Sequence, residues 1–103
     1  MSNLEDVIIR DSDKQYRLRI NGFLRNLGVS QIICTKENLE IEFIGGEVSV
    51  SVPYPRILEE LHKSIEKVLL AETQMMPKEI GNIRFYINDH VDEIKEARKN
   101  LSH

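Results

Sequence analysis

The chain of 103 residues lacks tryptophan, contains a single cysteine and has no long apolar stretch. One cysteine cannot form a disulfide within the chain, which fits a reducing compartment. The apolar runs are far shorter than the roughly 20 residues that a bilayer-spanning helix needs. The first ten residues lack the basic region and the long apolar region of a secretory signal. Together these absences predict a cytoplasmic protein.

Patterns that carry catalysis or bind metals are also missing. The histidines, His62, His90 and His103, form no i, i+4 pair on one helix, and a metal site needs several converging ligands. The sequence has neither a Gly-x-Ser-x-Gly elbow nor a glycine-rich phosphate-binding loop. Cys34 lies in an apolar run, where we interpret it as a small buried hydrophobe rather than a nucleophile. The sequence therefore predicts no cofactor, no metal and no catalytic residues, with a small enzyme lacking a recognisable motif as an alternative.

Size and composition predict one small globular domain. Hydrophobic residues make up 41% of the chain and charged residues 30%, which is ordinary for a globular protein. The formal net charge of −3 argues weakly against a general polyanion binder. We expect residues 11–103 to form a single domain and residues 1–10 to form an N-terminal arm or an edge strand.

A β-hairpin is the clearest structural signal. Three apolar residues alternate with glutamates before Gly45-Gly46, and three valines alternate with polar residues after it. Two adjacent glycines suit the positive φ angles of a tight hairpin turn. All six apolar side chains then share one face, and the other face is polar and acidic. The predicted register pairs Phe43 with Val48, Ile41 with Val50, and Leu39 with Val52.

The region before the hairpin predicts a helix over residues 11–27 and a strand over residues 30–35. The helix is indicated by apolar residues that recur at helical spacing and by Gly28, which is suited to closing it. The apolar residues of this stripe are Tyr16, Ile20, Phe23, Leu24 and Leu27.

The second half of the chain predicts a helix, a strand and a helix. Pro55 suits the first turn of a helix that runs to about Ala71. Residues 80–87 alternate and predict a fourth strand, and a last helix with a thin apolar stripe ends near Leu101. The result is a single α+β domain of order α-β-β-β-α-β-α, with a four-stranded sheet and helices mainly on one face.

Two groups of residues are candidate contact sites. Lys14, Arg17 and Arg25 lie at i, i+3 and i+11 of the predicted first helix and would form a basic row on one face. Such a row can bind phosphates or an acidic partner. Met75 and Met76 lie in a predicted loop, where exposed methionines form an adaptable surface for peptides.

These features predict a small non-enzymatic protein-binding or adaptor module, chaperone-like or regulatory, whose partner is another protein. A homodimer is also expected, because the last helix has a thin apolar stripe and a free sheet edge can pair with a partner. Nucleic-acid binding through the basic row is the alternative, although no aromatic platform interleaves with that row; no membrane partner is expected. The predicted element order loosely resembles that of small acidic dimeric chaperones for secretion effectors, and that of compact nucleic-acid modules.

Overall fold

The computed structural model describes residues 15–45 and 48–101. The first half contains β1 (Gln15–Leu18), the short helix α2 (Gly22–Asn26), β2 (Val29–Thr35), β3 (Asn38–Phe43) and β4 (Ser49–Pro53). The second half contains the 3-10 helix η1 (Leu58–Glu60) and the helices α3 (Leu61–Glu72), α4 (Pro77–Asp89) and α5 (Val91–Leu101). The arm or edge strand predicted for residues 1–10 lies outside the described residues.

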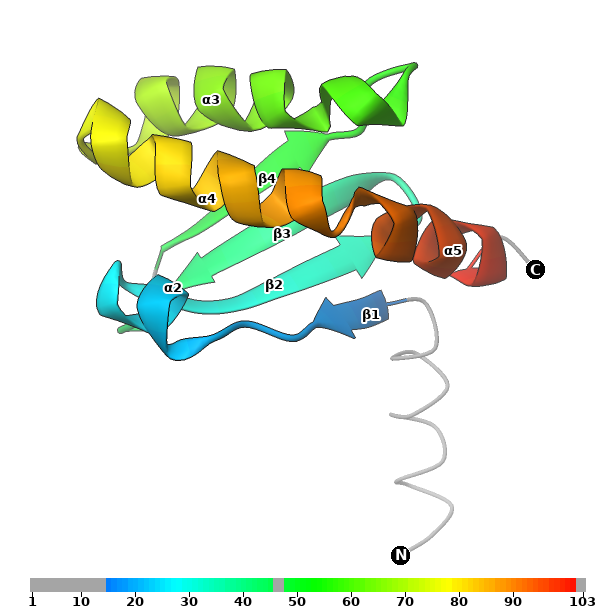
Figure 1. Cartoon of the computed structure of the whole chain (residues 1–103), viewed down its shortest axis with the longest axis horizontal. Coiled ribbons are helices and arrows are strands. Elements are labelled where there is room, and N and C mark those ends of the chain that lie inside the picture. The colour runs from blue at the N-terminus through cyan, green and yellow to red at the C-terminus, as the bar shows by residue number, and fades with distance from the viewer. Residues whose placement is uncertain (1–14, 46–47, 102–103) are drawn as a thin grey trace, which may run out of the picture.

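The four strands form one antiparallel sheet in the order β1-β2-β3-β4, so each strand pairs with its neighbour in sequence. Figure 1 shows α3, α4 and α5 on the same face of this sheet. The predicted α+β class, the four-stranded sheet and the placement of helices mainly on one face are confirmed. The order of elements roughly matches the predicted one and differs from it at residues 15–18 and 80–87.

The register predicted for the β3–β4 hairpin is confirmed along the strands. Leu39 lies opposite Val52 and Ile41 lies opposite Val50. All four side chains are buried, because they face the helices. The polar residues between them occupy the opposite face of the sheet.

At the turn of the hairpin, the Phe43 N–H donates to Val48 O at 3.1 Å. Gly45 adopts φ +109°, a left-handed value that glycine reaches without a steric clash. Gly46 lies outside the described residues. Phe43 is half-buried and Val48 is exposed, so the buried apolar face ends before the turn.

The predicted helix over residues 11–27 is wrong for most of its described length. Residues 15–18 form β1, which pairs with β2, and only residues 22–26 are helical. Tyr16 and Leu18 alternate with arginines, so this segment also fits the period of a strand. The Asn21 side chain then caps α2 by accepting the Leu24 N–H at 2.9 Å. Gly28 has φ +97° and ends the helical segment as predicted.

The predicted fourth strand over residues 80–87 is also wrong, because this segment belongs to α4. Pro77 occupies the first turn, and Glu79 accepts the N–H of Met76 at 2.8 Å. Ile80, Ile83 and Ile87 are spaced i, i+3 and i+7 and are buried on one side of the helix. Tertiary packing and the N-terminal cap therefore override the alternating pattern.

Two smaller boundaries also differ from the sequence prediction. Pro55 precedes the first turn rather than occupying it, since η1 begins at Leu58 and leads into α3. The last helix is confirmed as α5, and its thin stripe buries Ile94 and Ala97 within the same molecule.

The hydrophobic core lies between the sheet and the helices and receives a side chain from every described strand and helix. Among the described residues, no polar or charged side chain is buried. The polar groups that could serve a function therefore lie at or near the surface.

Replacement of Gly81 by alanine is expected to raise the free energy of unfolding by up to about 1 kcal/mol, because alanine is the better helix former. Gly81 lies inside α4, and an added Cβ would meet nothing within 4 Å. The matched change Gly45→Ala should lower the free energy of unfolding by about 1–2 kcal/mol, since alanine is strained at φ +109°. Urea unfolding followed by circular dichroism measures both. A clear loss of stability in the Gly81 variant would contradict the helical assignment of residues 77–89.

Candidate functional site

The structure separates the residues of the predicted basic row between two elements. Arg17 lies on β1 and Arg25 lies on α2, so no continuous helix carries the row. Lys14 lies outside the described residues. Arg17 and Arg25 nevertheless line one surface hollow of about 400 Å³, together with Arg19, Ser30 and Gln31. We call this the arginine hollow.

The arginine hollow has a strongly positive lining. Between Gln15 and Lys36 the chain contains no acidic residue. Arg17, Arg19 and Arg25 are exposed, and none of them forms an ion pair with a described residue. Exposed arginines that lie together in this way can bind an anionic group.

Glu42 on β3 borders the hollow. Its carboxylate accepts the Gln31 side-chain N–H at 2.6 Å, and its backbone oxygen accepts the Ser30 hydroxyl at 3.1 Å. Both polar side chains of the hollow are thus held in place by the neighbouring strand.

A second hollow, of about 510 Å³, lies between the start of α2 and α4. Phe23 on α2 is 54% exposed, and Phe85 on α4 is 75% exposed. We call it the phenylalanine hollow. Its polar lining consists of Asn21, Asn82, Tyr86, Asp89 and His90.

The wall of the phenylalanine hollow is fixed by three contacts of Tyr86. Its ring stacks on His90 with the ring centroids 4.2 Å apart, and His90 Nδ1 donates to Tyr86 O at 2.7 Å. The Tyr86 hydroxyl donates to Arg19 O, which ties α4 to the segment after β1. Burial raises the pKa of Tyr86, so the hydroxyl remains a donor at neutral pH. The hollow is therefore largely preformed.

The two hollows adjoin each other. Ile20 lines the arginine hollow, and the next residue, Asn21, lines the phenylalanine hollow. One short segment thus separates a cationic surface from an aromatic one. In Figure 1 this segment runs from β1 to α2 along the lower edge of the molecule.

The two candidate methionines do not share either hollow. Met75 is half-buried against the core, and its N–H donates to Thr73 Oγ1 at 3.2 Å. Met76 is 64% exposed and is the N-cap residue of α4, which begins at Pro77.

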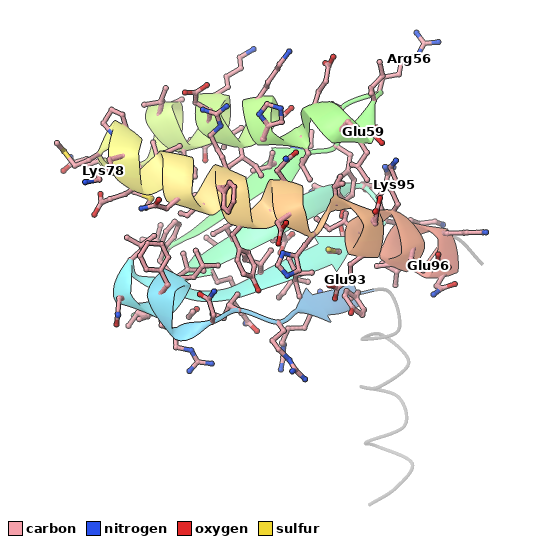
Figure 2. All side chains as sticks on the ribbon, in the orientation of Figure 1. Arg56, Glu59, Lys78, Glu93, Lys95 and Glu96 are labelled. Atoms are coloured by element: carbon pink, nitrogen blue, oxygen red, sulfur yellow. The ribbon has the colours of Figure 1, made fainter. Side chains whose placement is uncertain are left out.

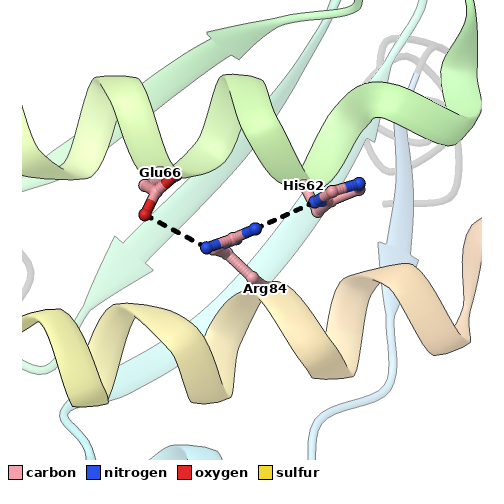
Figure 3. Close-up of polar contacts among 3 residues, drawn as sticks. All are labelled: His62, Glu66 and Arg84. Carbon is pink, nitrogen blue, oxygen red and sulfur yellow. Dashed lines mark hydrogen bonds and ion pairs between the residues drawn. The ribbon is translucent and has the colours of Figure 1, made fainter.

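A polar cluster joins α3 to α4 (Figure 3). Arg84 Nη1 lies 3.1 Å from Glu66 Oε2, and Arg84 Nη2 lies 3.1 Å from His62 Nδ1. Since arginine can only donate, His62 Nδ1 is the acceptor in this contact. The cluster is an interhelical contact, because Arg84 on α4 binds two side chains of α3.

The other charged contacts lie near α5 (Figure 2). Lys95 on α5 forms an ion pair with Glu59 of η1. The Tyr16 hydroxyl donates to Glu93 Oε2 at 2.5 Å, which ties β1 to the same helix. Both contacts fasten α5 to the rest of the fold.

Cys34 is fully buried on β2, as the sequence predicted. Burial raises the pKa of the thiol to about 11, although the nearby Tyr54 side chain partly opposes this effect. The Tyr54 hydroxyl donates to Thr35 O at 3.0 Å. The Arg98 guanidinium lies over the Tyr54 ring, 4.1 Å from its centroid. A thiol that is buried and protonated at neutral pH is not a nucleophile.

Metal binding and membrane insertion find no support in the described part of the chain. No three histidine, cysteine or acidic side chains there converge in a way that could hold a metal ion. Within the same residues, every helix is too short or too polar to span a bilayer. His103 lies outside the described residues.

Sequence reasoning missed Arg19, Phe23, Phe85 and the Tyr86–His90 stack. It assigned both phenylalanines to apolar faces, because hydrophobic spacing cannot distinguish an exposed ring from a buried one. The absence of acidic residues between Gln15 and Lys36 was the available signal for the arginine hollow.

No family model matches the chain, and searches of curated proteins and of solved structures give no significant match.

Proposed function

We propose that the protein is a non-enzymatic protein-binding or adaptor module whose contact surface is the phenylalanine hollow. The observation that carries this proposal is the pair Phe23 and Phe85, which are both more than half exposed and line one hollow. Exposed aromatic rings are unfavourable in water unless a partner covers them. Aromatic and arginine side chains also supply most of the binding energy in protein interfaces.

The polar groups of the hollow suit a polypeptide ligand. Asn21 and Asn82 each offer an amide donor and an acceptor, which can pair with a peptide backbone. Asp89 adds an acceptor at the same hollow. A few polar groups around an apolar centre are typical of a specific binding site.

The enzyme alternative has less support from the described residues. Catalytic groups are commonly brought toward neutral pKa values by burial or by neighbouring charges. Burial raises the pKa of Tyr86 in the phenylalanine hollow, which moves it further from neutrality. Tyr86 is therefore poorly suited to act as a general acid or base.

A cytosolic, regulatory or chaperone-like role and a homodimer remain parts of the proposal. The unpaired Cys34 suits a reducing compartment. The resemblance in element order to secretion chaperones does not support the proposal, because residues 15–18 and 80–87 form other elements than that order requires. The stripe of α5 does not argue for a dimer either, since it packs within the molecule.

The double variant Phe23→Ser/Phe85→Ser is expected to lose partner binding. A single interface hot spot contributes about 2 kcal/mol or more. The loss of two should therefore raise the dissociation constant by at least about 100-fold. The measurement is capture of a stoichiometric protein from native lysate, followed by calorimetry with that protein purified.

The matched control is Ile57→Ser/Leu70→Ser, which removes two apolar side chains that are 55% and 53% exposed elsewhere. This control should bind like the unaltered protein. Equal binding by both double variants would rule out the phenylalanine hollow as the contact surface.

A further inference from the structure

The partner's chemistry can be inferred from the charge next to the phenylalanine hollow. Arg17, Arg19 and Arg25 concentrate positive charge at one hollow of a protein whose formal net charge is −3. Three like charges in one hollow repel one another, and no described acidic residue pairs with them. Such an arrangement favours binding of anionic groups.

The two hollows are close enough to serve one ligand. They meet at the Ile20–Asn21 peptide, and the bond from Tyr86 to Arg19 O fixes this segment against α4. A peptide of about ten residues spans roughly 33–36 Å when extended. The molecule itself measures 45 × 32 × 23 Å, so a short extended peptide can reach both hollows.

We propose that the bound segment is an acidic peptide with an adjoining aromatic or aliphatic anchor. The anchor occupies the phenylalanine hollow, and the aspartate or glutamate side chains lie over Arg17, Arg19 and Arg25. This inference rests on the proposed protein-binding function, and it adds the composition of the ligand and the hollow that each part of it occupies.

A peptide fits these charges better than a single-stranded nucleic acid. Asp89 lies in the phenylalanine hollow, and Glu42 borders the arginine hollow. A nucleic acid carries a phosphate at every nucleotide, so bases stacked on Phe23 and Phe85 would bring phosphates close to Asp89. A peptide can instead place its uncharged part there and keep its carboxylates at the arginines.

The test is selection of random displayed peptides of about 12 residues on the immobilised full chain, a length that can span both hollows. Selected peptides are expected to combine an apolar anchor with several acidic residues. One selected peptide is then synthesised and titrated by fluorescence anisotropy against purified variants. Labelled oligo-dT is titrated in parallel as the nucleic-acid probe.

Arg17→Glu/Arg25→Glu should weaken binding of the peptide about tenfold or more. Added salt should also weaken binding of the peptide to the unaltered protein. Arg17→Gln/Arg25→Gln should also weaken binding of the peptide. This variant replaces the charge-reversed one in the test if charge reversal disturbs folding. The matched control is Lys63→Glu/Lys67→Glu on exposed positions of α3, which should stay within about twofold.

The outcomes separate this inference from the proposed function. If the selected peptides are apolar without acidic enrichment, and the Phe23→Ser/Phe85→Ser variant does not bind them, only the inference is overturned. Peptides insensitive to the phenylalanine variant would overturn both. Oligo-dT binding tighter than the selected peptide would overturn the inference in favour of nucleic acid.

Discussion

Ile83→Ala is expected to lower the free energy of unfolding by about 2–5 kcal/mol. Ile83 is fully buried where α4 packs on α3 and the sheet, and its truncation leaves a cavity in a continuous core. The native state of a domain of this size is stable by only about 5–15 kcal/mol. The substitution therefore removes a large share of the stability. Urea unfolding measures the change.

Phe85→Ala is the matched control for this prediction. Phe85 lies two positions further along α4 and is 75% exposed, so its replacement should change the stability by less than about 0.5 kcal/mol. In a strand the two side chains would share one face and the two substitutions would resemble each other. Similar losses for both variants would contradict the structure. Phe85→Ala should impair partner binding instead.

The Cys34 thiol is expected to react with Ellman's reagent at least about 10³-fold more slowly in the native protein than in urea. The side chain is fully buried, so reaction requires opening of the sheet, and opening to the unfolded state costs at least about 5 kcal/mol. The reaction rate at pH 8 measures the protection. Native and unfolded rates that agree within about tenfold would show that Cys34 is accessible.

The same thiol should make the protein sensitive to alkali. Burial raises its pKa from 9.0 to about 11, so the folded state retains the proton longer than the unfolded state. Below pH 9 the thiol is protonated in both states, so its titration does not change the free energy of unfolding. Stability then falls between pH 9 and about 11, by about 3 kcal/mol in total.

Comparison with Cys34→Ala tests this contribution. Burial raises the pKa of Tyr54 in both proteins, and contact with Cys34 adds to that shift in the unaltered protein. The variant should lose stability less steeply over the same interval. Identical slopes for the two proteins would show that Cys34 does not cause the alkaline loss.

The hairpin was predictable because two independent signals agreed. The alternation of Leu39 and Ile41 with glutamates and the turn glycines required the same register. Residues 15–18 and 80–87 carried only a periodicity, and a short periodic segment fits a helix or a strand. In each segment tertiary packing determines which structure forms. Leu18 pairs opposite Ile32 in the sheet, and Ile83 packs into the core from α4.

The candidate site was only partly predictable for a related reason. Arg17 and Arg25 were predicted to lie on one continuous helix, which does not form. The pairing of β1 in the sheet and the position of α2 nevertheless bring both arginines to one hollow. The exposure of Phe23 and Phe85 depends on where α2 and α4 rest on the sheet. No local pattern in the sequence encodes that placement.

The order of elements along the chain has a consequence for synthesis. All four strands precede the three helices that cover their apolar face, and each strand pairs only with its neighbour in sequence. Neighbouring strands need little loop closure and can pair early. At about 5–20 residues per second, residues 54–101 take about 2–10 s to translate after β4 is complete. During that interval the nascent sheet exposes the apolar face formed by Ile32, Ile41 and Val50. This face is buried only after α3, α4 and α5 have been synthesised.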